Sequence, residues 1–436
     1  MAVDDFCFWH MLYLRLDVWC HLTSYHSGTV ETLWPFVFGR FVAGIGGAGM
    51  TDLLSVLVNV RSFIIAAGIL GQGCGGPLGG LVADMIGWRW SLIGQAPIGV
   101  LCLALAHWQL PASHKHIGSK SHLSLWSFDY LGLSAFFIAV TSFIFATTDG
   151  GIGAPSNTPA ILAASCIFLA VFVMIECFGT KNPIIPPSIV RAPGLAGIFF
   201  GQIIFFASIS TVSAHPANRA IIRGIADALQ ILNNLPPYLS QIDHLSNSGI
   251  AMRIWPSGLG LILGSVIAGK AMSNALAVSV GSLLLMMLRW ANGIQGIEVY
   301  YCFPWAIGSG LLLSAQFLAL TICSPEGQMA SATAVYYLSQ QIGQIIGTSV
   351  STVALQRLFR LRLELGLGDV PSDQKVQLIK EILKDFSFTT ELPPALQKAV
   401  SSCYIEAYRL IPAFALVLIL IFGAIILFFK EKATPN

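Results

Sequence analysis

The chain has 436 residues, of which 55% are hydrophobic and only 10% are charged, and its formal net charge is +2. A soluble globular domain carries roughly 25% charged residues, so this chain cannot cover a water-facing surface with charge. The composition excludes an ordinary cytosolic enzyme and a disordered protein, and the small net charge excludes a nucleic-acid binder. It predicts a polytopic membrane protein.

Hydrophobic stretches of about 20 residues recur along the chain, and each is long enough to cross a bilayer as a helix. Helices are expected because lipid offers no hydrogen-bond partners to an open backbone, and no alternating barrel pattern is present. The fold class is therefore all-α. The stretches predict about eleven transmembrane helices, at residues 35–58, 62–84, 90–110, 129–149, 159–178, 195–214, 250–271, 273–289, 303–323, 330–354 and 408–429.

Composition shifts divide the chain into segments, and lysine and arginine in the short loops favour a cytoplasmic C-terminus. The predicted segments are an atypical N-terminal segment at 1–34, an N-terminal bundle with linker helices at 35–214, an irregular loop with a polar insertion at 215–249, a C-terminal bundle at 250–354, a non-cytoplasmic amphipathic loop at 355–402, and the last span with a cytoplasmic tail at 403–436. Within the amphipathic loop, apolar residues at helical spacing from Leu355 to Leu363 predict a helix on the membrane surface.

Two glycine-rich stretches near the start of the chain are candidate functional segments. The first, GRFVAGIGGAGM, places Arg40 at the edge of a span, where an arginine either snorkels to the interface or needs a partner. The second contains Pro77, which kinks a helix, and glycines that allow a hinge or a tight packing surface. Its candidate residues are Gly71, Gly75, Gly76, Pro77, Gly79 and Gly80.

Polar residues inside predicted spans are the other candidates. Asp52 lies twelve residues beyond Arg40. It is either a proton or cation site paired with Arg40 or Arg61, or a carboxylate that is held protonated or reaches water. Gln340 and Gln344 share one helix face, and Gln316 is a further amide in a span. These amides would hydrogen-bond a substrate or join neighbouring helices.

Metal and enzyme chemistry leave no signature in the sequence. The nine cysteines lack any CxxC or cysteine–histidine spacing for zinc. No histidines, aspartates or cysteines cluster on one membrane surface as a membrane-embedded enzyme would require. We therefore expect no metal, no cofactor and no enzymatic activity.

Several motifs resemble one family in both order and spacing. GRFVAGIGGAGM at 39–50 looks like the fourth-helix arginine motif of the major facilitator superfamily, and GGPLGG at 75–80 followed by ADMIGWRWSLIGQAP at 83–97 looks like the fifth-helix antiporter motif. In the second half, LPPYLSQIDHLSNSGIAMRIWPSGLGLILGSVIAG at 235–269 and GQMASATAVYYLSQQIGQIIGTSVS at 327–351 resemble the tenth-helix entry and thirteenth helix of the fungal drug:proton antiporters with fourteen spans. The vacuolar basic amino acid transporter and multidrug branch is the most similar.

The resemblance implies a helical bundle whose halves rock about a central site while protons are exchanged for a small molecule. Arg40 would match the arginine that assists proton transfer. Gly75, Gly76, Pro77, Gly79 and Gly80 would match the segment associated with antiport. Against the family pattern, residue 35 corresponds to the start of the fourth span, so the first three spans are expected to be missing or replaced and the N-terminal half to be incomplete.

The expected function is secondary active transport, namely proton-coupled export of a drug, toxin or secondary metabolite. One alternative is a vacuolar basic amino acid transporter, and another is a non-transporting product of a truncated or misassembled gene. Expected partners are a small-molecule substrate, protons and the lipid bilayer, with no nucleic acid. The sequence predicts no oligomeric state, and it favours the plasma membrane over the vacuolar membrane.

Overall fold

The computed structural model describes residues 35–44, 71, 75, 78–109, 129–149, 158–179, 185–192, 194–212, 246–271, 274–289, 296–325, 328–367, 372–384, 392–408 and 410–428. The regular structure in these residues is helical, which confirms the all-α fold class. The predicted segment 1–34, Asp52, Gly76, Pro77 and most of the predicted spans 35–58 and 62–84 lie outside the described residues.

Helices occupy the predicted hydrophobic stretches from residue 90 onward. Short helical pieces at 35–44 and 78–86 precede them. The helices are α4 (Trp88–Ile93), α5 (Gln95–Gln109), α6 (Tyr130–Asp149), α7 (Thr158–Met174) with a π-helical turn (Ile175–Gly179), α8 (Pro187–Val190), α9 (Leu195–Val212), α11 (Asn247–Ala271), α12 (Ala275–Arg289), a 3-10 turn (Gly296–Tyr301), α13 (Cys302–Cys323), α14 (Met329–Gly366), α15 (Ser372–Lys384), α16 (Pro394–Tyr408) and α17 (Ile411–Phe428).

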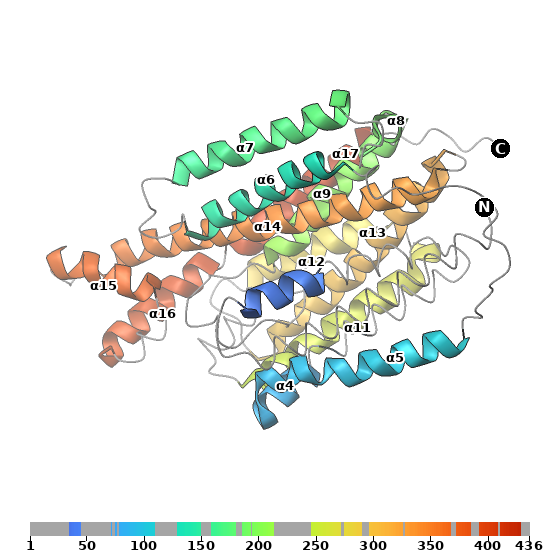
Figure 1. Ribbon diagram of the computed structural model, residues 1–436. Coiled ribbons are helices and arrows are strands. Elements are labelled where there is room, and N and C mark those ends of the chain that lie inside the picture. The colour runs from blue at the N-terminus through green and yellow to red at the C-terminus, as the bar shows by residue number, and fades with distance from the viewer. Residues whose placement is uncertain are drawn as a thin grey trace.

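Figure 1 shows most of the long helices running side by side as a bundle, with α7 and α6 along one flank and α5 along the other. Within the described residues, five helical segments are long and apolar enough to cross a membrane, and α9 and α12 contribute shorter apolar helices. The number falls below the predicted eleven partly because the first two spans are largely undescribed. Helix α14, which contains the predicted span 330–354, is not among them.

Glycines lie at several close helix contacts of the described bundle. On α11, a Cβ atom added at Gly264 would clash with the backbone carbonyl of Ile307 on α13, and one at Gly260 would approach the carbonyl oxygen of Phe303 within 2.6 Å. On α14, a Cβ atom at Gly343 would clash with the carbonyl oxygen of Ile203 on α9. Small residues four apart let helix backbones approach this closely, so these glycines fix the α11–α13 and α9–α14 pairs.

Helix α14 continues well past the predicted end of its span. It runs unbroken from Met329 to Gly366, so the start of the predicted amphipathic loop is a direct continuation of the membrane helix. The predicted apolar stripe is present on one face, where Leu355, Phe359 and Leu363 are buried. Phe359 meets Tyr404 of α16 with ring centroids 5.3 Å apart. The stripe therefore packs on protein, which is a different role from the predicted membrane-surface helix.

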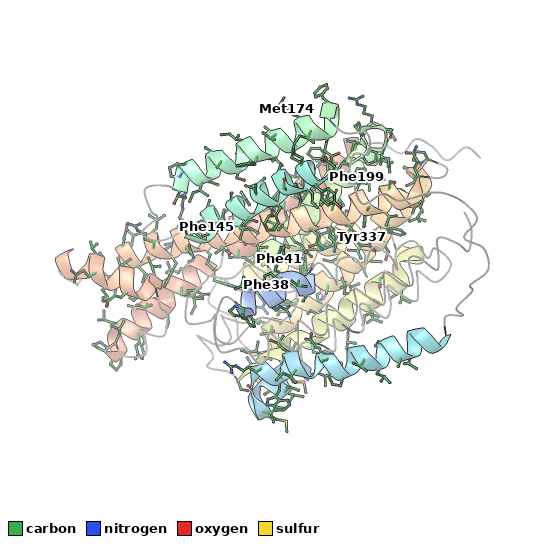
Figure 2. All side chains as sticks on the ribbon, viewed as in Figure 1. Phe38, Phe41, Phe145, Met174, Phe199 and Tyr337 are labelled. Atoms are coloured by element: carbon green, nitrogen blue, oxygen red, sulfur yellow. The ribbon has the colours of Figure 1, made fainter. Side chains whose placement is uncertain are left out.

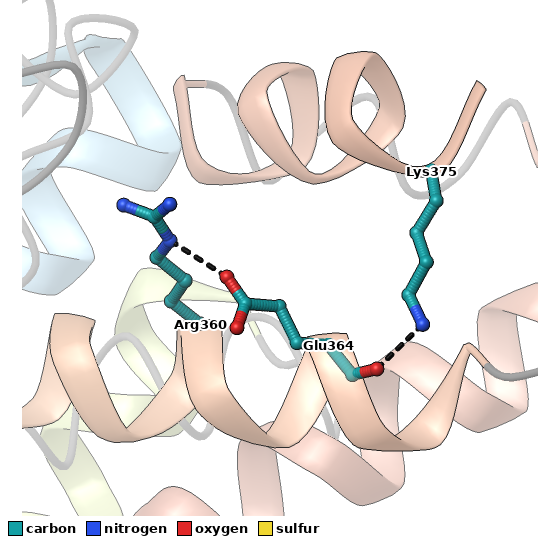
Figure 3. Close-up of polar contacts among 3 residues, drawn as sticks. All are labelled: Arg360, Glu364 and Lys375. Atoms are coloured by element: carbon teal, nitrogen blue, oxygen red, sulfur yellow. Dashed lines mark hydrogen bonds and ion pairs between the residues drawn. The ribbon is translucent and has the colours of Figure 1, made fainter. Parts of the chain in front are cut away.

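The end of α14 forms a small unit with α15 and α16 that projects from one end of the bundle (Figure 1). Polar contacts lie on the surface of this unit. Arg360 Nε lies 2.9 Å from Glu364 Oε1, and Lys375 Nζ donates to the Glu364 carbonyl oxygen at 2.5 Å (Figure 3). Exposed pairs of this kind contribute at most about 1 kcal/mol. The buried apolar side chains of the unit, including Leu367, Ile382 and Val400, supply most of its stability.

Candidate functional site

The candidate site lies where α9, α13 and α14 meet. Phe199 of α9, Leu320 of α13 and Tyr336 of α14 belong to one buried cluster. The Phe317 and Tyr336 rings are 5.8 Å apart in an edge-to-face arrangement. Figure 2 labels Phe199 and Tyr337 at this junction. This cluster holds the three helices together, and the polar residues of the site lie about one helical turn from it.

Two glutamines are buried about one helical turn from this cluster. Gln202 of α9 is 0% exposed and Gln316 of α13 is 7% exposed. Neither the amide nitrogen nor the amide oxygen of either side chain has a hydrogen-bond partner in the described part of the chain. A buried polar group left without a partner costs roughly 1–3 kcal/mol. Among the described residues, both amides are therefore held at a cost to the stability of the fold.

The two amides lie at the same level of the bundle. Gln202 follows Phe199 by three residues, whereas Gln316 precedes Leu320 by four, so each is one turn from the shared cluster. Because the predicted spans alternate in direction, α9 and α13 are expected to run antiparallel. One turn forward on α9 and one turn back on α13 therefore lead to the same side of the cluster.

The two predicted amides of α14, Gln340 and Gln344, lie near the face of this helix that contacts α9. Gly343 faces Ile203 of α9. From Gly343, Gln340 lies about 60° and Gln344 about 100° around the helix. Both side chains are half-buried. Since Gln344 and Gln202 are the chain neighbours of Gly343 and Ile203, they share a level of the α9–α14 contact. We call Gln202, Gln316, Gln340 and Gln344 the amide site.

No charge accompanies the amide site on its own helices. Helices α9 and α13, and α14 from Met329 to Gln356, contain no aspartate, glutamate, lysine, arginine or histidine. The helices supply glutamine amides, serine and threonine hydroxyls and aromatic rings. Such a surface can hydrogen-bond a neutral solute and stack on its rings, but it offers no ion-pair partner.

The sequence-predicted residues of the first half lie elsewhere. Arg40 is half-buried in the helical piece 35–44. Phe41 of the same piece, labelled in Figure 2, contacts Phe137 of α6 with ring centroids 5.7 Å apart. Gly75 and Gly80 are half-buried and Gly71 is exposed. Added Cβ atoms at Gly71 and Gly79 would meet nothing within 4 Å among the described residues. The proton-coupling and antiporter-motif assignments therefore stay predictions.

Gln202 and the tight helix contacts are not among the features predicted from the sequence. The glutamine is one polar residue in an apolar stretch, which by itself does not reveal whether it has a partner. The close glycine contacts did have a signal, because GLILG at 260–264 and GQIIG at 343–347 place glycines four residues apart. In the described part of the chain, no group of three histidines, cysteines or acidic residues is placed to hold a metal ion.

Comparisons with known proteins agree with this architecture. No known family model matches the chain. It is 28% identical to the vacuolar membrane amino acid uptake transporter fnx2 of Schizosaccharomyces pombe, over 86% of this chain and 64% of that protein. It is 28% identical to the multidrug resistance protein fnx1 of the same yeast, over 92% of this chain and 76% of that protein. It is 24% identical to the efflux pump aunC of Aspergillus niger, over 78% and 65%.

A solved structure shows the same fold. The bacterial homolog of the human lysosomal transporter Spinster superposes with a TM-score of 0.51 at 14% identity, covering 98% of this chain and 85% of that one. The fold and the relatives define an integral membrane protein of the major facilitator type. The chain is related in sequence to fungal vacuolar amino acid transporters and efflux pumps of the major facilitator superfamily. It spans 64% of the length of fnx2.

Proposed function

We propose that the chain is a secondary transporter that exports a small, neutral, hydrogen-bonding organic molecule in exchange for protons. The observation that carries this proposal is the pair of buried amides, Gln202 and Gln316, without partners among the described residues. A substrate that reaches them supplies the missing hydrogen bonds, which gives the fold a reason to retain them.

The lack of charged residues on the helices of the amide site favours a neutral substrate over a basic amino acid. A cationic side chain would need a carboxylate near the amide site, and its helices carry none. The alternative of vacuolar basic amino acid transport has support from the relatives. The chain is 23% identical to the vacuolar basic amino acid transporter 2 of Saccharomyces cerevisiae, over 88% of this chain and 83% of that protein. We assign the plasma membrane, in keeping with export.

Transport is best tested in inside-out membrane vesicles with an imposed pH gradient. The neutral dye Nile red and tritiated lysine serve as parallel probes. Gradient-driven accumulation of the dye, saturable and lost on collapsing the gradient, supports the proposal. Gradient-driven accumulation of lysine instead supports the vacuolar alternative. If a wider panel of neutral and cationic solutes also fails to accumulate, the non-transporting product is the correct description.

Arg40 provides the test of proton coupling. Asp52 is the predicted partner of Arg40, so the positive charge of Arg40 would act on the candidate proton-carrying group. We expect Arg40→Ala to reduce gradient-driven flux by about tenfold or more, and Arg40→Lys to restore part of it because the charge returns. Arg360→Ala is the matched control, since Arg360 is exposed on the projecting unit. Undiminished proton-driven flux in Arg40→Ala would remove Arg40 from the coupling mechanism.

A further inference from the structure

A hydrogen bond joins the segment after the glycine-rich stretch to a helix of the second half. Asp84 lies near the end of the helical piece 78–86, immediately before the Trp88–Trp90 region. Its Oδ2 atom accepts a hydrogen bond from the backbone N–H of Ser248 at 2.7 Å, across 164 residues of sequence. Ser248 is the second residue of α11.

The bond falls where a helix most needs an acceptor. The first N–H groups of a helix have no partner within it, and a negative charge there interacts favourably with the helix dipole. Ser246 Oγ, from the residue just before α11, accepts from the Gly249 N–H at 3.2 Å. The Ser248 N–H is taken by Asp84 instead. The start of α11 is thus capped partly by its own turn and partly by a carboxylate from the first half.

The contact lies at the non-cytoplasmic end of the bundle under the predicted orientation. With a cytoplasmic C-terminus, the span 62–84 ends and α11 begins on the opposite side of the membrane. In a transporter whose halves rock about a central site, these two helix ends must separate when the site opens to that side.

We propose that Asp84 and the start of α11 form a latch that holds the non-cytoplasmic end of the two halves closed. The latch rests on the proposed transport function, because only a rocking bundle needs to release it. It adds a residue with a defined conformational role. The loss of the Asp84–Ser248 bond removes stabilisation from the closed state alone, so the population open to the non-cytoplasmic side rises.

The test measures the separation of the two helix ends directly and needs no substrate. Spin labels are attached to cysteines at Leu81 and Met252, each about one turn from the latch, in the full chain with its nine native cysteines replaced. Both positions are exposed. Double electron–electron resonance in lipid nanodiscs then gives the distance distribution. We expect Asp84→Ala to increase the population with the longer distance between the labels. The ratio of the longer-distance population to the shorter-distance population should rise about fivefold.

Two further variants separate the latch from general damage. Ser248→Pro removes the N–H group on α11 that donates to Asp84, at a first-turn position that tolerates proline. We expect the same shift of the distance distribution toward longer distances. Asp129→Asn is the matched control, because Asp129 Oδ1 accepts from the Gly132 N–H at 2.8 Å and so caps α6 locally. That variant is expected to leave the distances unchanged. Identical distributions in Asp84→Ala, Ser248→Pro and the parent would overturn the latch. Since no transport is measured, that result leaves the transport proposal standing.

Discussion

Replacing Gln202 with leucine is expected to abolish transport while leaving the folded protein at least as stable. The Gln202 amide is 0% exposed and has no partner among the described residues. Leucine has a similar volume and no polar atoms, so it relieves a desolvation penalty of roughly 1–3 kcal/mol. The same change removes two hydrogen-bonding atoms from the amide site. A residue that matters only for packing would not move stability and transport in opposite directions.

The measurement pairs a thermal unfolding midpoint in detergent with gradient-driven flux in vesicles. We expect the unfolding midpoint of Gln202→Leu to stay the same or rise by a few degrees. The flux should fall by about tenfold or more, because the substrate loses one hydrogen bond and keeps one polar group without a partner. Gln341→Leu is the matched control, because Gln341 is exposed on α14. A Gln202→Leu protein that transports at the parent rate would show that the amide is only a tolerated imperfection of the core.

The helices could be predicted from the sequence because each reflects a local property. Long apolar stretches gave α6, α13 and α17 with bounds that differ by only a few residues from the observed ones. The end of α14 differs because hydropathy locates the membrane boundary, whereas helix propensity locates the helix end. After residue 354 the chain becomes charged but stays rich in leucine, arginine and glutamate, which are strong helix formers. The helix therefore continues until Gly366.

The candidate site could be predicted only in part. Gln316, Gln340 and Gln344 were found because polar residues inside a span are conspicuous. The importance of Gln202 depends on whether neighbouring helices supply a partner, and that is a property of packing between segments far apart in the chain. The Asp84–Ser248 bond has the same character, since nothing local to either residue predicts the other.

Substituting alanine at Gly264 is expected to cause the largest loss of stability among single-methyl changes in the described helices. An added Cβ would collide with the backbone of Ile307 on α13. Backbone cannot rotate away as a side-chain end can, so the helices must separate and lose contact along their length. We expect a loss of about 2–3 kcal/mol, despite the gain of roughly 1 kcal/mol that alanine brings over glycine within a helix.

Gly281→Ala on α12 is the matched control for this prediction. An added Cβ there meets nothing within 4 Å among the described residues. It is therefore expected to keep or raise the unfolding midpoint, through helix propensity alone. Size-exclusion profiles of heated samples measure both variants in one experiment. If Gly264→Ala and Gly281→Ala unfold at the same temperature, the α11–α13 contact has room to adjust. Opposite shifts of the two unfolding midpoints would establish that backbone contact through glycine holds α11 and α13 together. Apolar area alone would not hold them, because lipid is as apolar as the helix surfaces it would replace.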